Sequence, residues 1–188
     1  MILVCVALEA ELPEFRLNGY TVLYTGVGKV QAAAKLAYEL GSPSRHPRYT
    51  EVWNYGTAGG LNPLVAGLVE IGTFVQRDMC AEPQAPRGTI PFSDPVVGDL
   101  KTHAPIMQVR CGTGDSFVMA PDPWFVKADV DCVDMEGWAL AYVCKQHHIK
   151  FRSWKYISDM ADEDAAESWA KNVQDGAEIF TEKVRNGV

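Results

Sequence analysis

Hydrophobic residues recur along the chain with two different periods. Apolar residues at helical spacing predict helices over residues 30–40, 137–147 and 167–185. Short runs rich in β-branched and aromatic residues predict strands, which are residues 1–7, 20–24, 51–55, 72–76, 106–111, 130–133 and 151–157. Strands that alternate with helices indicate an α/β protein whose sheet is largely parallel and flanked by helices.

The segment of residues 81–105 interrupts this alternation. It is rich in proline and shows little periodicity, which predicts a long ordered loop. Loops of this length are uncommon in compact domains and are often functional. No stretch has the composition of a linker, so we expect the 188 residues to form a single domain over positions 1–188.

Charge and composition argue against several classes of partner. Twenty-four acidic residues against 17 Lys and Arg give a net charge of −7, which disfavours nucleic acids and anionic membrane surfaces. No apolar run approaches the roughly 20 residues that a membrane span requires. The apolar residues 1–7 lack a basic flank and run directly into Glu9 and Glu11, which favours a buried first strand over a signal peptide.

The cysteines and histidines indicate neither disulfides nor a metal centre. The five cysteines are odd in number, scattered and without a Cys-x-x-Cys pair, which predicts reduced thiols in a cytoplasmic protein. His147 and His148 are adjacent, so on a helix they point about 100° apart and cannot share a metal ion as an i, i+4 pair can. We therefore expect no metal site and no cofactor.

Acidic residues follow two of the predicted strands. Asp134 and Glu136 come at and after the end of residues 130–133, and Asp159 comes just after residues 151–157. In open α/β sheets, ligands bind in the crevice beyond the carboxyl ends of the strands. These carboxylates are therefore predicted to form two edges of one site.

Two glycine-rich segments also follow strands. Gly26 and Gly28 precede a predicted helix, but the third glycine of a dinucleotide fingerprint and the Gly-Lys-Ser/Thr of a P-loop are missing. Residues 54–61, with three glycines, would let a ligand approach the backbone closely. Taken alone, each segment predicts a turn, and a flavodoxin-like or dinucleotide-binding protein is disfavoured.

Six segments, taken in order, resemble motifs of the purine nucleoside phosphorylase superfamily, and within it of the methylthioadenosine/S-adenosylhomocysteine nucleosidases. They are Ala7–Leu12 (ALEAEL), Thr25–Val30 (TGVGKV), Asn54–Leu61 (NYGTAGGL), Gly114–Val118 (GDSFV), Val133–Glu136 (VDME) and Ile157–Asp162 (ISDMAD). Each motif is weak alone, but together they span nearly the whole chain. The resemblance implies a three-layer α/β/α fold with a central mixed, largely parallel sheet.

The resemblance also implies an enzyme that hydrolyses the N-glycosidic bond of a purine nucleoside. Asp159 matches the family's acid at purine N7, and Glu11 matches the carboxylate that orients and deprotonates water. Glu136 matches the residue that holds the ribose hydroxyls, with Met135 packing beside the sugar. Without the resemblance, Asp159 is interpreted as a helix N-cap and Glu11 as a surface glutamate.

Other matching positions would bind the substrate. Phe117 and Val118 match the shelf on which the purine stacks and where the backbone of Val118 reads its edge. Trp169 falls where the family carries a Phe that closes the pocket around the 5′-substituent, although it also fits an apolar position of an amphipathic helix. The remaining substrate-binding residues expected are Thr57, Ala58, Gly59 and Ser158.

Water is the expected nucleophile, because the arginines that hold phosphate in phosphorylases of this superfamily have no counterpart here. Glu11 and Asn54-Tyr55 stand in their places. Phosphorolysis supported by Lys29 and Arg77 stays an alternative, as does a module that binds nucleosides without turnover.

The chain departs from the family in ways that leave the substrate open. The region of residues 72–106, which in the family builds part of the dimer interface and of the 5′-pocket, is shortened, so a homodimer is one option rather than a firm expectation. Lys155 stands where an Arg assists the water site, and Asp159 rather than Asn suits the 6-amino group of adenine. Adenosine, methylthioadenosine, adenosylhomocysteine and futalosine-type nucleosides all remain candidates.

Overall fold

The computed structural model describes residues 1–13, 16–17, 19–41, 49–93, 97–104, 109–120 and 122–186. Its strands are β1 (Ile2–Val6), β2 (Thr21–Tyr24), β3 (Glu51–Gly60), β4 (Leu68–Glu70), β5 (Thr73–Gln76), β6 (Leu100–Lys101), β7 (Arg110–Thr113), β8 (Cys132–Asp134) and β9 (Lys150–Asp159). Its helices are α1 (Lys29–Gly41), α2 (Pro123–Lys127), α3 (Gly137–Gln146), α4 (Ala165–Asn172) and α5 (Asp175–Arg185).

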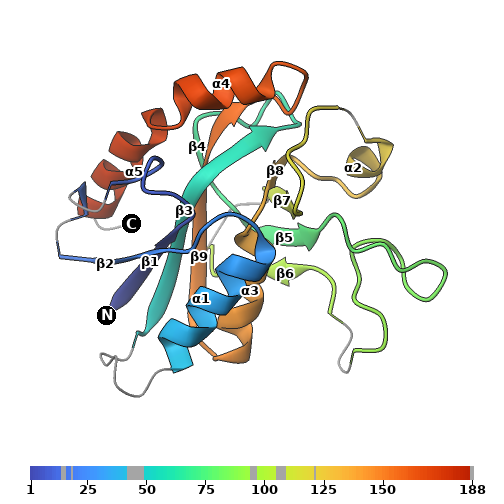
Figure 1. The fold of residues 1–188 in the computed structure, drawn as a ribbon, viewed down its shortest axis with the longest axis horizontal. Coiled ribbons are helices and arrows are strands. Elements are labelled where there is room, and N and C mark those ends of the chain that lie inside the picture. Colours follow the sequence, from blue (N-terminus) through green and yellow to red (C-terminus); the bar gives the residue numbers. More distant parts are fainter. Residues whose placement is uncertain are drawn as a thin grey trace.

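All of these strands belong to one mixed sheet (Figure 1). Its order is β2-β1-β3-β8-β7-β5-β6, with β9 paired to β3 and β4 paired to β9. The pairs β1–β2, β1–β3, β3–β9, β5–β7 and β7–β8 are parallel, whereas β3–β8, β4–β9 and β5–β6 are antiparallel. The long strand β3 is the centre of the sheet, because it pairs with β9 along most of its length and with β1 and β8 at its two ends.

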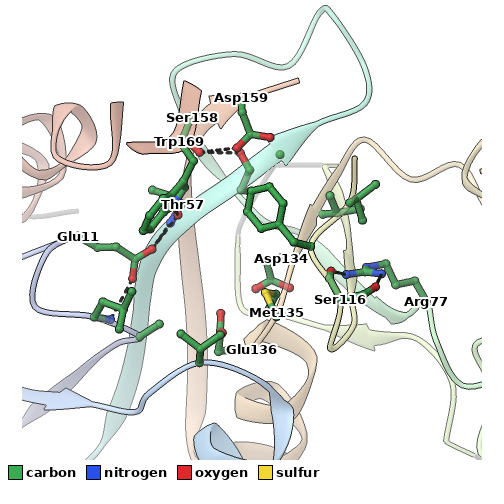
Figure 2. A pocket seen from close by; sticks show the side chains of 18 residues that line it. Glu11, Thr57, Arg77, Ser116, Asp134, Met135, Glu136, Ser158, Asp159 and Trp169 are labelled. Carbon is green, nitrogen blue, oxygen red and sulfur yellow. Dashed lines mark hydrogen bonds between the residues drawn. The ribbon is translucent and has the colours of Figure 1, made fainter. Parts of the chain in front are cut away.

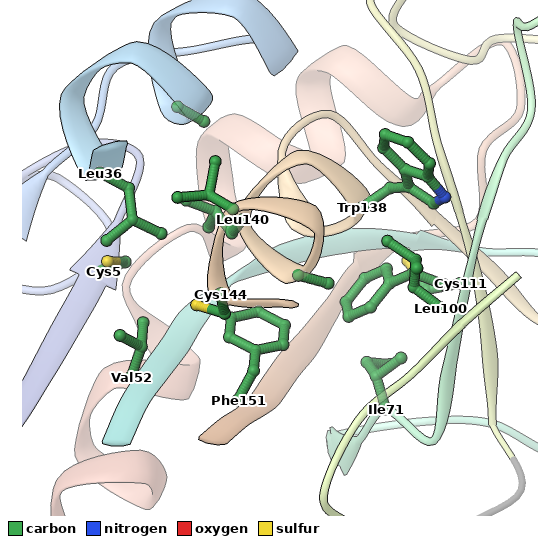
Figure 3. Packing of buried hydrophobic residues seen from close by; sticks show 14 of the residues in the cluster. Cys5, Leu36, Val52, Ile71, Leu100, Cys111, Trp138, Leu140, Cys144 and Phe151 are labelled. Atoms are coloured by element: carbon green, nitrogen blue, oxygen red, sulfur yellow. The ribbon is translucent and has the colours of Figure 1, made fainter. Parts of the chain in front are cut away.

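Helices cover both faces of the sheet, which confirms the three-layer α/β/α fold. On one face, Leu36 of α1 and Leu140 of α3 join Val52 of β3 in a large apolar cluster (Figure 3). On the other face, Phe180 of α5 stacks on Tyr55 of β3 with ring centroids 4.6 Å apart. Burial on both faces explains the continuous apolar run of β1.

The glycine-rich segment of residues 54–61 corrects one prediction. The strand predicted over residues 51–55 continues as β3 to Gly60, so these glycines lie in a strand and not in a turn. A Cβ at Gly59 would lie only 2.9 Å from Oδ1 of Asp159. The glycines therefore provide space for close packing rather than a turn. The turn predicted at Gly26 and Gly28 is confirmed, since both residues have positive φ.

The C-terminal part of the chain corrects a second prediction. The single helix predicted over residues 167–185 is two helices, α4 and α5. A Cβ at Gly176, the second residue of α5, would lie 2.4 Å from the Cβ of Tyr156, so the missing side chain lets the start of α5 pack closely against β9. The hydrophobic pattern also missed β4, β6 and α2, which are too short to show a period.

The proline-rich segment agrees with the predicted loop where the structure describes it. Its residues form turns and an isolated bridge between Ile90 and Val97 before β6 begins at Leu100. Residues 94–96 and 105–108 lie outside the described part of the chain. The strand predicted over residues 106–111 is therefore seen only as β7, from Arg110 onward.

Two expectations concern the chain as a whole. All five cysteines are free thiols, and burial raises the pKa of Cys144 to about 12, which keeps that thiol protonated and unreactive. Of the helices in the described ranges, each is too short or too polar to cross a bilayer.

Candidate active site

A pocket of about 230 Å³ lies at the carboxyl ends of β3, β8 and β9 (Figure 2). It contains every residue predicted from the sequence to act on or bind a nucleoside. The lining residues are Ala7, Leu8, Glu11, Val27, Thr57, Ala58, Gly59, Arg77, Ser116, Phe117, Val118, Val133, Asp134, Met135, Glu136, Ser158, Asp159 and Trp169. The six motifs, scattered along the chain, thus converge on one cavity. Among the described residues, no group of His, Cys, Asp or Glu side chains is arranged to hold a metal ion.

Glu11 is buried in this pocket rather than exposed on the surface, with 4% of its surface accessible. One carboxylate oxygen, Oε1, accepts hydrogen bonds from the backbone N–H and the hydroxyl of Thr57, both at 2.8 Å. The other oxygen, Oε2, accepts from the backbone N–H of Leu8 at 3.1 Å. These donors fix the orientation of the carboxylate.

Trp169 reaches the same group of residues from helix α4. Its indole Nε1–H donates to the Thr57 hydroxyl at 2.9 Å, and that hydroxyl in turn donates to Glu11 (Figure 2). Trp169 is half-buried and lines the pocket, so it is more than an apolar position on an amphipathic helix. Sequence reasoning missed this hydrogen bond, because it joins residues 112 positions apart.

Asp159 lies at the end of β9, where the strand contains an irregularity. Ala58 of β3 pairs with Ile157 and Gly59 pairs with Asp159, so Ser158 has no partner in this register. The Ser158 hydroxyl donates to Oδ2 of Asp159 at 2.8 Å, and the Ala161 N–H donates to Oδ1 at 3.0 Å. A β-bulge next to an active site typically re-aims a side chain, and here it brings Asp159 into the pocket.

Glu136 precedes helix α3 and is also buried. Its Oε1 accepts a hydrogen bond from the backbone N–H of Gly28 at 2.8 Å, which joins the first glycine turn to the pocket. Burial raises the pKa of Glu136 to about 7; Lys155 opposes this shift and the nearby Asp134 adds to it. The carboxyl group therefore changes its charge near neutral pH.

Lys155 forms a buried ion pair with Asp134, with 2.8 Å between Nζ and Oδ2. Asp134 also accepts hydrogen bonds from the Thr113 hydroxyl and the Gly137 N–H. Burial acts to raise the pKa of Asp134, but Lys155 and these donors more than offset it and hold the pKa below its usual range. Asp134 lines the pocket as a paired carboxylate, whereas Lys155 lies behind the lining.

The segment that carries Phe117 and Val118 is held in place by Arg77. The buried guanidinium of Arg77 donates to the carbonyl oxygens of Gly112 and Gly114 and to the hydroxyl and carbonyl of Ser116. Phe117 is 45% exposed, which leaves its ring open at the mouth of the pocket.

The other cation considered as a phosphate ligand, Lys29, is neutralised by acids. Its Nζ lies 2.5 Å from Oδ1 of Asp78 and 3.7 Å from Oδ2 of Asp115, and it donates to Oε1 of Gln76 at 2.9 Å. Lys29 is absent from the pocket lining. Lys29 is therefore already paired, and the donors of Arg77 are directed at neutral oxygens of the chain.

Comparison of sequences connects the chain to characterised proteins. Residues 15–186 match the family model of the phosphorylase superfamily. A 5′-methylthioadenosine/S-adenosylhomocysteine nucleosidase from Bacillus velezensis is 30% identical over 186 residues, covering 88% of this chain and 78% of the relative. A nucleosidase of the same name from Shewanella loihica is 30% identical over 173 residues, covering 80% and 73%.

Solved structures share the fold at lower identity. Futalosine hydrolase of Helicobacter pylori superposes with a TM-score of 0.85 at 21% identity, covering 98% of this chain and 95% of that one. The 5′-methylthioadenosine/S-adenosylhomocysteine nucleosidase of the same organism, solved with butyl-thio-DADMe-Immucillin-A, also has a TM-score of 0.85 at 21% identity, with coverage of 98% and 96%.

Proposed function

The chain belongs to the phosphorylase superfamily, and on that premise we propose that it hydrolyses the N-glycosidic bond of a purine nucleoside. The products are the free base and the ribose moiety. One observation carries this proposal: two buried carboxylates, Glu11 and Asp159, reach the same pocket from different elements. Hydrolysis of this bond needs one group at the departing base and another at the attacking water.

Each carboxyl group has a defined step in the reaction. As the bond from C1′ to N9 breaks, its electron pair moves onto the purine, and Asp159, which must enter this step in its protonated form, gives its proton to N7. Water adds to C1′ and passes a proton to Glu11. The backbone donors from Leu8 and Thr57 hold the Glu11 carboxylate in the position from which it accepts this proton.

The remaining lining residues divide between sugar and base. We assign the ribose hydroxyls to Glu136, with Met135 beside the sugar. The base would lie against Phe117 and the backbone of Val118. The floor formed by Thr57, Ala58 and Gly59, together with Ser158 and the wall at Trp169, would complete the site within one domain.

The charges around the pocket support water over phosphate as the nucleophile. A phosphate dianion needs fixed cationic donors. Lys29 is paired with Asp78, and the donors of Arg77 are directed at oxygens of its own chain. An adenine nucleoside is the favoured substrate, since the sequence relatives are named for 5′-methylthioadenosine and S-adenosylhomocysteine and an Asp at 159 suits a 6-amino group.

A panel of purine nucleosides, incubated with the protein with and without phosphate, tests the proposal. Release of free base and ribose without phosphate is the expected result. Formation of ribose 1-phosphate in the presence of phosphate would show that the reaction is phosphorolysis and not hydrolysis. Saturable binding without any product would instead indicate a nucleoside-binding module, and a lack of both binding and turnover would refute a nucleoside site.

The ionisation of Glu136 predicts a pH dependence. Its ionised form accepts hydrogen bonds from the ribose hydroxyls, and its pKa is raised to about 7. We expect kcat/KM to fall as the pH decreases below 7, by about tenfold per unit at the limit for one essential ionised group. A pH profile of kcat/KM measures this dependence. The inflection should disappear in Glu136→Gln, and an identical inflection in that variant would assign it to another group.

Trp169 predicts a preference for compact 5′-substituents. Its flat apolar face suits a methylthio group but leaves less space for homocysteine, and one misplaced methylene is worth about 1–3 kcal/mol. Trp169→Ala is therefore expected to narrow the difference in kcat/KM between methylthioadenosine and S-adenosylhomocysteine, with adenosine as a reference. An unchanged ratio of the two kcat/KM values would show that Trp169 does not contact the 5′-substituent.

A further inference from the structure

Helix α4 contacts the neighbours of both proposed catalytic carboxylates. Trp169 donates to the Thr57 hydroxyl at 2.9 Å, and Asn172, one turn later on the same face, donates to the carbonyl of Ser158 at 2.8 Å. Of the eight residues in α4, only Ala165 is fully buried. The indole N–H of Trp169 and the amide of Asn172 therefore connect this helix to β3 and β9.

The hydrogen bond from Trp169 determines where the Thr57 proton points. A hydroxyl has one proton and rotates freely until its partners fix it. Because the indole N–H occupies an acceptor position on Oγ1 of Thr57, the hydroxyl proton is directed to Oε1 of Glu11 at 2.8 Å. A donor to a hydroxyl also strengthens the bond which that hydroxyl makes. Trp169 thus orients Glu11 through Thr57.

The hydrogen bond from Asn172 acts on the other carboxylate. Ser158 is the bulged residue of β9; it is left out of the register with β3, and its hydroxyl reaches that strand, 3.5 Å from the carbonyl oxygen of Ala58. Asn172 supplies a donor to its carbonyl oxygen, while the Ser158 hydroxyl donates to Oδ2 of Asp159 at 2.8 Å. Asn172 therefore holds the bulge in the conformation that presents Asp159 to the pocket.

We propose that helix α4 is a positioning element for both carboxylates, with Trp169 acting on the water side through Thr57 and Asn172 acting on the leaving-group side through Ser158. This inference rests on the proposed hydrolysis. Activity then requires that α4 is correctly positioned, because this one helix orients both Glu11 and Asp159. Trp169 and Asn172 touch neither reacting atom in this scheme.

Two substrates distinguish the effect of Trp169 on Glu11 from the effect of Asn172 on Asp159. Adenosine needs a protonated leaving group, whereas the p-nitrophenolate of a p-nitrophenyl riboside departs without a proton. Trp169→Phe, which keeps an aromatic ring but lacks the N–H, is expected to lower kcat about tenfold on both substrates. Asn172→Leu is expected to lower kcat about tenfold on adenosine and to have little effect on the aryl riboside.

Lys171→Ala is the matched control on the same helix. Its ammonium pairs with Glu167 on the surface, so kcat should stay near that of the unaltered protein on both substrates. If Trp169→Phe and Asn172→Leu lost kcat equally on both substrates, or if both kept normal kcat, the assignment of Trp169 to the water side and Asn172 to the leaving-group side would be wrong. Thermal melts of the variants distinguish a loss of folded protein from a loss of positioning.

A measurement without turnover keeps the inference separate from the proposed function. The indole N–H resonance of Trp169, assigned by its loss in Trp169→Phe, is expected to shift in both Thr57→Val and Glu11→Gln. If the protein cleaves no nucleoside yet this resonance responds to both changes, the proposed function fails while the link from α4 to Glu11 stands. A resonance that responds to neither change would refute the link.

Discussion

Asp159→Asn is expected to lower turnover of the purine nucleoside by about a hundredfold or more while the fold stays intact. An amide keeps the shape of the side chain but gives no proton to the departing purine. The hydrogen bonds to Asp159 come from the Ser158 hydroxyl and the Ala161 N–H, and the amide oxygen still accepts one of them. The loss should therefore appear in kcat, with only a small effect on stability.

Free base release at saturating substrate measures this effect, and circular dichroism with a thermal melt checks the fold. Asp162→Asn is a suitable control, since Asp162 belongs to the same motif but is exposed and lies outside the pocket. Near-normal turnover in Asp159→Asn would show that Asp159 is not the proton donor.

Glu11→Gln is expected to abolish hydrolysis while purine binding survives. Glutamine keeps one oxygen for the donors of Leu8 or Thr57 but cannot take a proton from water. General-base catalysis typically contributes about a hundredfold to ten-thousandfold, so turnover should fall by at least that lower figure. Base release and equilibrium binding of adenine, measured on the same preparation, separate the two effects.

Glu9→Gln gives the matched comparison, because Glu9 lies two residues away in the same motif and is exposed. We expect its turnover to be unaltered. Normal hydrolysis by Glu11→Gln would mean that the N-terminal motif was assigned the wrong role. Loss of both turnover and adenine binding would instead show that Glu11 helps to form the purine site.

The hydrophobic pattern predicted a largely parallel sheet flanked by helices, and the resemblance to the nucleosidase family implied the three layers and the convergence of the motifs. Both faces of the sheet are buried, so β1 stands out as an apolar run, whereas β9 is marked by its aromatic and β-branched residues. The order of six short motifs then placed Glu11, Glu136 and Asp159 in one pocket, although they lie far apart in the sequence.

What the pattern could not predict depends on contacts between distant residues. Glycines within β3 resemble a turn locally, and only the closeness of Asp159 to Gly59 shows that they belong to a strand. Likewise, Lys155 stands where the family carries an Arg that assists the water site, and here it pairs with Asp134. The choice of partner for a buried charge is a property of the folded chain, and no local signal contains it.

The bulge at Ser158 means that the proton donor of this site is specified by a residue count as well as by a residue type. Gly59 pairs with Asp159 because Ser158 is left out of the ladder; regular pairing after Ile157 would put Ser158 opposite Gly59 and Asp159 one position further on. Since a shift by one residue turns a side chain to the other face of the sheet, the carboxyl group would then point away from the pocket. A relative with the same Ser-Asp pair but a regular β9 would therefore keep the motif in its alignment and lose the proton donor from its pocket. For proteins of this kind, the register of β9 at the motif is as informative about activity as the identity of its residues.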